Sequence, residues 1–272
     1  MPELPEVETV KNQLKDKLLN LKIDDSKVYH NNIIENMDSI DFSKKIKGQT
    51  IKDITRRGKW LVLKLDDYYL ISHLRMEGKY NFKDKEEVLS KHEHVVFLLS
   101  NGITMRYHDT RKFGKMHLIK KELLNESRPF TELGVEPFSN EFTKEYLKDK
   151  LKSKSIPIKT ALLDQKIVVG IGNIYVDEIL FLSKVRPTRK ASNVSNKEIE
   201  MIIENTRETL EKAIKLGGTT IRSFSSLSVH GKFQNELLVH GKEGEPCPSC
   251  EGDILKIKVN GRGTYYCKKC QK

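Results

Sequence analysis

The chain has 272 residues, of which 37% are hydrophobic and 32% charged, a length that allows two domains with sizeable cores and a composition that excludes a disordered protein. No segment approaches the roughly 20 apolar residues of a membrane span, and the acidic N-terminus lacks the apolar core of a signal peptide, so a cytoplasmic protein without membrane contacts is expected. Lys and Arg exceed Asp and Glu by 49 − 38 = 11, which suits a polyanionic partner such as nucleic acid but also suits simple solubility.

The first half of the chain is predicted to be a helix followed by β-structure. Residues 5–18 place their apolar side chains on one helical face, and Pro5 suits a first turn. From about residue 20 to residue 120, short apolar segments alternate with turn residues. Hairpins are predicted over residues 60–72 and 94–107, around Asp-Asp and Asn-Gly turns. Several short strands with regular turns indicate a sandwich or a barrel.

The second half of the chain is predicted to be helical. The pattern changes near Arg128-Pro129, and residues 133–137 are typical of a linker between domains. In the last predicted helix, apolar residues recur at helical spacing, which core packing explains. The predicted helices cover residues 141–152, 157–164, 173–183 and 196–215.

All four cysteines lie near the C-terminus. Their spacing, two Cys-x2-Cys pairs separated by 16 residues, is typical of a four-thiolate zinc site; the ligands would be Cys247, Cys250, Cys267 and Cys270. The segment between the pairs alternates apolar and polar residues around Asn260-Gly261, which predicts a β-hairpin. Two disulfides are the alternative, but they suit secreted proteins. Four protein ligands close the zinc coordination shell, so one structural Zn²⁺ is expected.

The N-terminal segment has an unusual chemical possibility. A small second residue such as Pro2 normally allows removal of Met1, which leaves a secondary amine at the new N-terminus. An α-amino group titrates near 7.7–8.0, so part of it is neutral and nucleophilic at neutral pH. Glu3 and Glu6 can supply acid–base chemistry, although carboxylates are also ordinary at a helix start.

Six segments taken together resemble the formamidopyrimidine-DNA glycosylase family, in that family's order and spacing. They are Pro2-Glu-Leu-Pro-Glu-Val-Glu-Thr, Arg57-Gly-Lys59, Ser72-His-Leu-Arg-Met-Glu-Gly, Tyr107-His-Asp-Thr-Arg-Lys-Phe-Gly, Val169-Gly-Ile-Gly-Asn-Ile-Tyr and the four-cysteine ribbon.

The resemblance implies an α+β multidomain fold. An N-terminal catalytic β-sandwich flanked by helices would cover residues 1–131, followed by a linker at 132–138. A helix–two-turn–helix DNA-binding domain would cover 139–225, and the end of the lesion loop with the four-cysteine zinc ribbon would cover 226–272.

The resemblance also implies a bifunctional glycosylase and lyase of base-excision DNA repair. Pro2 would attack C1′ of a nucleotide carrying an oxidised purine, and Glu3 would act as a proton donor. The resulting iminium acidifies the C2′ proton, so β- and δ-elimination cut the strand. Lys59 would donate a proton during β-elimination, and Arg262 at the ribbon tip would bind DNA and assist δ-elimination.

Other matching positions are implied DNA contacts. A glycosylase must extrude its target nucleotide and fill the gap, and Met76, Arg111 and Phe113 match the family's wedge. The alternative is that Met76 and Phe113 are core residues, the more common place for these residue types. His73, His92 and Lys154 would contact the DNA backbone. Asn173 follows a Gly-x-Gly turn at a predicted helix start, where backbone amides suit a phosphate.

The segment from Gly217 to Gln234 aligns with the family's lesion loop, but residues 223–230 depart from the family pattern, and His240 stands where an aromatic residue is expected. The expected partner is double-stranded DNA with oxidised bases or abasic sites. A monomer at the bacterial nucleoid is expected because a single lesion is asymmetric. Two alternatives stay open, an endonuclease VIII-like enzyme for oxidised pyrimidines and a non-catalytic DNA-binding module.

Overall fold

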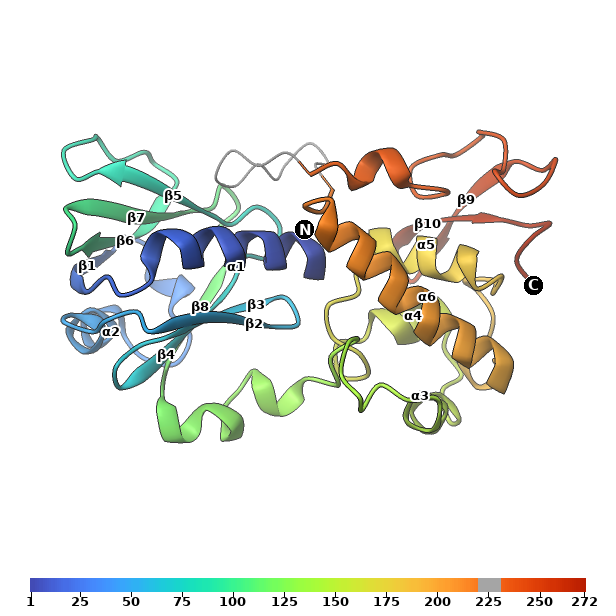
Figure 1. The fold of residues 1–272 in the computed structure, drawn as a ribbon, viewed down its shortest axis with the longest axis horizontal. Helices are drawn as coiled ribbons and strands as arrows, with labels where there is room; N and C mark the ends of the chain where they lie inside the picture. Colours follow the sequence, from blue (N-terminus) through green and yellow to red (C-terminus); the bar gives the residue numbers. More distant parts are fainter. Residues whose placement is uncertain (220–230) are drawn as a thin grey trace. The chain divides into compact units, whose positions relative to one another are not determined.

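The computed structural model describes residues 1–219 and 231–272. The middle of the predicted lesion loop, residues 223–230, where the sequence departs from the family pattern, lies outside them. The chain forms two compact units (Figure 1). The first comprises Met1–Thr131 with Thr219–Gly231, and the second comprises Glu132–Gly218 with Lys232–Lys272. Among the described residues, no helix is long and apolar enough to span a bilayer.

The first unit is built on two four-stranded antiparallel sheets, as the predicted sandwich requires. One sheet has the order β1-β6-β7-β5, formed by Ile23–Val28, Glu93–Leu99, Ile103–His108 and Lys79–Asp84. The other has the order β2-β3-β4-β8, formed by Asp53–Arg57, Trp60–Lys64, Tyr68–His73 and Lys115–Lys120. Both hairpins predicted from the turn residues, β3-β4 and β6-β7, are confirmed.

Two helices complete this unit. The predicted helix α1 (Leu4–Leu18) buries its apolar face, packs against β2 and shares one core with residues of both sheets. Helix α2 (Ser39–Ile46), which packs on β1, was not predicted. It has only eight residues, and its start is set by Asp38, whose side chain accepts from two backbone amides. Such a helix is too short for periodicity to reveal. Short 3-10 turns occupy Asn31–Ile33, Lys121–Glu126 and Phe130–Glu132.

The second unit is helical and ends in the predicted hairpin. The long helix α6 begins at a capping box in which Ser195 and Glu198 satisfy each other's backbone amides. Its helices are α3 (Lys144–Leu151), α4 (Ile158–Leu163), α5 (Asn173–Leu182) and α6 (Asn196–Lys215), with 3-10 turns at Ala191–Asn193 and Phe233–Glu236. The ribbon strands are β9 (Ile254–Val259) and β10 (Arg262–Cys267).

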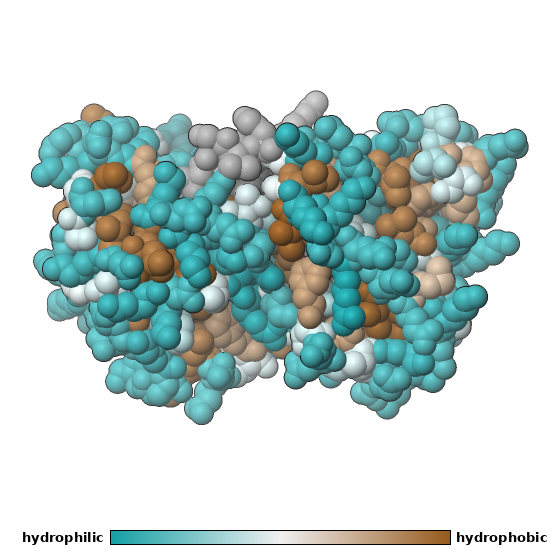
Figure 2. Space-filling model, in the orientation of Figure 1, coloured by the Kyte–Doolittle hydropathy of each residue, from teal (hydrophilic) through white to brown (hydrophobic). Residues whose placement is uncertain are grey.

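The surface is mainly polar. On the face shown in Figure 2, hydrophilic residues dominate, and apolar residues show through as separate patches. The large apolar side chains that remain exposed include Met76 and Phe113, two residues that the resemblance assigns to DNA.

Candidate functional site

The segment that resembles the family's nucleophile lies at the buried start of α1. Pro2 and Glu3 are both buried, and Glu3 forms a capping box with Glu6. The Glu6 carboxylate accepts from the Glu3 amide at 2.8 Å and, through its other oxygen, from the Thr219 amide at 2.8 Å. Both carboxylates thus hold backbone amides, since in the capping box the Glu3 side chain accepts from the Glu6 amide in return.

Lys59 lies in the tight turn between β2 and β3. Gly58 adopts a φ of +56° there, a conformation that glycine tolerates, and Lys59 is only 5% exposed. Arg56 anchors the turn, because its side chain donates to the Gly58 carbonyl at 3.2 Å and to the Glu8 carboxylate at 2.8 Å. Burial raises the pKa of Glu8, but hydrogen bonds and charges from Arg56 and Lys11 outweigh burial and lower it. The turn with Lys59 is therefore tied to helix α1, which begins two residues after Pro2.

Two loops of the first unit present the predicted wedge. Met76, after β4, is 37% exposed, and Phe113, between β7 and β8, is 49% exposed. The guanidinium of Arg111 lies over the Phe113 ring at 4.7 Å from its centroid. These side chains are surface residues, so the alternative that they belong to the core does not hold.

Tyr107 fixes both wedge loops. A β-carbon placed on Gly78 would lie 2.1 Å from the Tyr107 hydroxyl, and one on Gly114 would lie 1.7 Å from it. Two glycines thus allow the loops of Met76 and Phe113 to approach the same buried phenol. Burial, with the charge of Asp109 beside it, raises the pKa of Tyr107 and keeps the phenol neutral.

Asp109 organises the Phe113 loop from inside. Its fully buried carboxylate accepts from the backbone amides of Arg111 (2.9 Å), Phe113 (2.9 Å) and Gly114 (2.8 Å). Three amides converging on one carboxylate fix the loop's conformation without using the side chains of Arg111 or Phe113, which stay available for a ligand.

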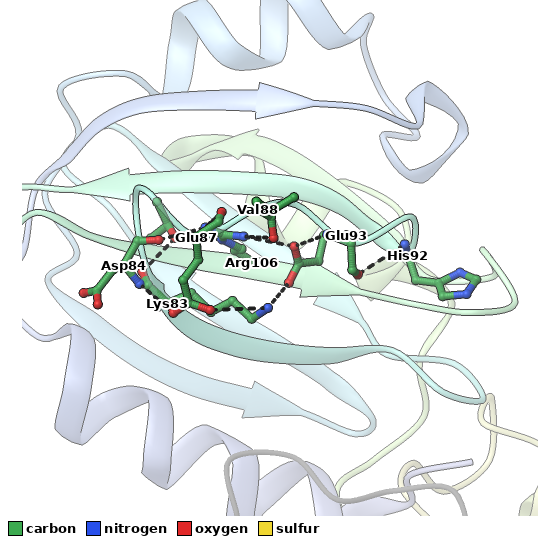
Figure 3. Close-up of polar contacts among 9 residues, drawn as sticks. Lys83, Asp84, Glu87, Val88, His92, Glu93 and Arg106 are labelled. Carbon is green, nitrogen blue, oxygen red and sulfur yellow. Dashed lines mark hydrogen bonds and ion pairs between the residues drawn. The ribbon is translucent and has the colours of Figure 1, made fainter.

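His92 is the last residue of the loop between β5 and β6, and a buried arginine binds that loop (Figure 3). Arg106, 1% exposed, donates to the carbonyls of Asp84 and Glu87 at 2.8 Å each and to the Glu93 carboxylate at 3.1 Å. Burial raises the pKa of Glu93, but hydrogen bonds from Ser90, Arg106 and Lys83 outweigh burial and lower it. In Figure 3 the His92 ring points away from this cluster.

His73, at the end of β4, is buried and held in one orientation. Its Nδ1 accepts from the Arg75 amide at 2.9 Å, and its ring meets Trp60 edge-on at 4.7 Å. Burial and the nearby charges of Arg75 and Lys59 hold the pKa of His73 well below its ordinary value. A neutral ring with an occupied Nδ1 carries its proton on Nε2, where it can donate to a phosphate.

The remaining predicted DNA contacts belong to the second unit. Asn173 begins α5 after the Gly170–Gly172 turn, and its side-chain amide donates to the Gly263 carbonyl at 3.0 Å. Arg262 is exposed at the start of β10, next to the Asn260-Gly261 turn, whose residues both have positive φ, as the predicted hairpin requires. Lys154 lies 4.0 Å from the Asp164 carboxylate.

The four cysteines fit one zinc ion. Their sulfurs all lie within 4.8 Å of one another, with Cys247–Cys270 at 3.8 Å and Cys250–Cys267 at 3.5 Å. A tetrahedral Zn²⁺ with Zn–S bonds of about 2.3 Å needs sulfurs about 3.8 Å apart. The predicted structural zinc site is therefore supported by geometry, and disulfides are not formed.

The residues that sequence reasoning missed are those that support the site. Asp109 and Tyr107 lie inside a recognised segment but were given no role, and Arg106 lies just before it. Each acts through buried contacts with other loops, which neither spacing nor residue type reveals. The signal that the sequence offers is the aspartate itself, because Asp commonly accepts from the backbone amide two residues on, as Asp109 does from Arg111.

Comparison with known proteins places the chain in a family. Residues 1–116 match the formamidopyrimidine-DNA glycosylase N-terminal domain, residues 133–225 match the H2TH domain of the same enzymes, and residues 244–272 match a zinc finger found in FPG and IleRS.

Relatives and structural neighbours cover essentially the whole chain. Formamidopyrimidine-DNA glycosylase of Oceanobacillus iheyensis is 48% identical over 100% of this chain and 98% of its own length, and that of Bacillus subtilis is 47% identical, covering 100% and 99%. A Lactococcus lactis FPG mutant in complex with Fapy-dG-containing DNA superposes with a TM-score of 0.94 at 40% identity, covering 100% of both chains. The Lactococcus lactis Fpg complex with abasic-site DNA gives 0.93 at 40% identity, covering 99% of both. The chain therefore belongs to the formamidopyrimidine-DNA glycosylase family.

Proposed function

We propose that this chain excises oxidised purines from double-stranded DNA and then cuts the strand at the resulting abasic site. The observation that carries the proposal is the exposed wedge. Met76 and Phe113 project from two loops tied to one buried tyrosine, in the same unit as Pro2, Glu3 and Lys59. Apolar side chains that are exposed yet rigidly mounted suit insertion between base pairs, and a reaction at C1′ needs an extruded nucleotide.

The proposed chemistry begins with Pro2 as the N-terminal residue. Its secondary amine attacks C1′, the C1′–N bond to the damaged base breaks, and the base leaves with a proton. Protonation of the ring oxygen O4′ then breaks the C1′–O4′ bond, opens the sugar and gives an iminium between C1′ and the Pro2 nitrogen. The iminium acidifies C2′, and loss of a C2′ proton expels the 3′-phosphate; a second elimination expels the 5′-phosphate. Glu3 and Lys59 are both buried, and both carry side chains that are suited to move these protons.

DNA contacts are proposed for both units. His73, Met76, His92, Arg111 and Phe113 would act from the first unit, and Lys154, Asn173 and Arg262 from the second. The zinc ion holds the ribbon that carries Arg262 and takes no part in the chemistry, because four cysteines fill its coordination shell. An enzyme with this substrate is expected to work as a monomer at the nucleoid.

Borohydride trapping on a duplex with one 8-oxoguanine opposite cytosine tests the proposal. The form that begins at Pro2 should give a covalent adduct, and a form that retains Met1 should give none, because its Pro2 nitrogen is an amide. Pro2→Gly keeps a free amine and should give a weaker adduct. An adduct on oxidised pyrimidine but not on 8-oxoguanine would favour the endonuclease VIII-like alternative. Absence of any adduct, including on abasic DNA, would leave a non-catalytic DNA-binding module.

A further inference from the structure

The second unit contains a buried ion pair that has no part in the proposed chemistry. Lys159 of α4 and Asp177 of α5 are both fully buried, and Lys159 Nζ lies 2.8 Å from Asp177 Oδ1. Removing two charges from water costs free energy that the pair recovers only with good geometry and further hydrogen bonds. The further partners of this pair therefore indicate what it holds in place.

Three of those partners are consecutive residues of the zinc ribbon. Lys159 Nζ donates to the Gly263 carbonyl at 3.0 Å and to Thr264 Oγ1 at 2.7 Å. The second oxygen of Asp177 accepts from the Tyr265 amide at 3.3 Å. The beginning of β10 is thus fastened to α4 and α5 by the ion pair, consistent with the packing of α5 against β10 (Figure 1).

His240 joins the same network. Its Nδ1 lies 2.8 Å from Asp177 Oδ2, and its ring meets the Tyr265 ring at 4.9 Å in an edge-on arrangement. This is the position where the family pattern predicts an aromatic residue. The imidazole supplies an aromatic face to Tyr265 and adds a hydrogen bond to the buried carboxylate.

Two proposed DNA contacts depend on this fastening. Arg262 directly precedes Gly263, whose backbone the ion pair holds, and the Arg262 side chain is exposed. Asn173, the first residue of α5, donates to the same Gly263 carbonyl at 3.0 Å. One carbonyl thus accepts from both Lys159 and Asn173, which fixes the ribbon tip relative to the start of α5.

We propose that Lys159 and Asp177 are positioning residues that hold Arg262 in register with Asn173 for DNA binding, without touching DNA themselves. The inference rests on the proposed DNA-binding role of Arg262. Apolar replacements of a buried ion pair often preserve stability, so the pair is better explained by the orientation that it gives the ribbon tip than by stability.

The test is a mutant cycle on binding to duplex DNA that contains a tetrahydrofuran abasic-site analogue. Lys159→Met and the doubly apolar Lys159→Met/Asp177→Leu should each weaken binding about tenfold, the loss expected for one charge-assisted contact. In an Arg262→Ala background the same changes should have almost no further effect, because the residue that they position is gone. The double variant keeps the test usable if the unpaired Asp177 impairs folding, and zinc content reports whether the ribbon is intact.

Arg207→Met is the matched control. Arg207 lies in the same unit and donates to the carbonyls of Pro137, Ser139 and Phe142, none of which belongs to the ribbon. Any loss that it causes should add to that of Arg262→Ala. The inference is overturned if the ion-pair variants weaken binding equally with and without Arg262, if they bind normally, or if Arg262→Ala itself has no effect. Pro2 trapping is independent of all three outcomes, so it tests the proposed function separately.

Discussion

At the scale of single residues, the two apolar side chains of the proposed wedge are exposed, and the groups that fix their loops are buried. Met76 and Phe113 lie on the surface, whereas Tyr107 and Asp109 below them are fully buried. Insertion into a base stack requires an apolar side chain that does not fold back onto its own surface. A buried carboxylate that binds three loop amides meets this requirement through the backbone, so the wedge side chains remain free to contact a ligand.

Gly114→Ala is expected to destabilise the first unit. The added carbon would lie 1.7 Å from the Tyr107 hydroxyl, so either the loop or the phenol has to move. Overpacking of this kind costs about 1–3 kcal/mol in the free energy of unfolding. Urea unfolding measures the loss, and excision of 8-oxoguanine should fall with it because Phe113 shifts with the loop.

Two variants check this explanation. Tyr107→Phe removes the oxygen and should restore part of the stability of Gly114→Ala. Gly263→Ala is the control, since a β-carbon there meets nothing within 4 Å, and its unfolding free energy should stay near that of the wild type. A Gly114→Ala protein as stable as the wild type would show that the loop is not held against Tyr107.

At the scale of elements, the loop between β5 and β6 depends on a charged cluster whose strength varies with pH. The pKa of Glu93 is lowered in the folded protein, so its contribution to stability is complete above the unfolded value of about 4.3 and is lost as the pH falls through the folded value. Glu93→Gln should therefore cost about 1–3 kcal/mol in unfolding free energy at neutral pH, and the difference from wild type should shrink below about pH 4.

Glu87→Gln is the matched control for this pH dependence. The Glu87 carboxylate lies 3.7 Å from Lys83 and is 50% exposed, so its ion pair is screened by water and contributes little. The unfolding free energy of Glu87→Gln should match that of the wild type at every pH. A Glu93→Gln deficit that stays constant down to acid pH would contradict the proposed role of the carboxylate's charge.

The zinc ribbon is an element whose order is expected to depend on its metal. Its small core consists of apolar residues around Cys247 and Cys267. A core of this size is not expected to keep the ribbon folded when the ion is removed. Structural zinc contributes about 10–16 kcal/mol of apparent binding free energy in comparable fingers. Removal of zinc by a chelator should raise hydrogen exchange in residues 244–272 and leave the first unit protected. Cys250→Ser should do the same, and unchanged exchange in either case would exclude a structural metal.

Local sequence patterns predicted most elements but not the contacts that hold the site. Helix α1, the Asn260-Gly261 hairpin and the four sulfurs follow from periodicity, turn chemistry and spacing, which act over a few residues. Arg106 and Lys159 have no such signal. Each looks like an ordinary charged residue, and its partners lie up to 22 residues away for Arg106 and up to 105 residues away for Lys159.

At the scale of the whole molecule, the chain carries a formal net charge of +11, and proposed DNA contacts occur in both units. Charge and shape should contribute to binding in different ways. Lysines and arginines that neutralise phosphates release counterions, so they determine how steeply affinity falls with salt. Apolar wedge residues act where a nucleotide is extruded and release no counterions, so they should affect affinity for a lesion without changing the salt dependence.

Binding to lesion-containing duplex, measured over a series of salt concentrations, separates the two contributions. Arg262→Ala should lower the slope of log affinity against log salt by about 0.9, the value for one phosphate contact. Phe113→Ala should leave that slope unchanged and reduce the preference for lesion DNA over undamaged DNA. Lys150→Ala is the control for general charge, since its ammonium lies over the Tyr146 ring and no DNA contact is assigned to it. Equal slopes for Arg262→Ala and wild type would remove Arg262 from the proposed phosphate contacts, and a changed slope for Phe113→Ala would mean that the wedge loop also positions a cationic residue.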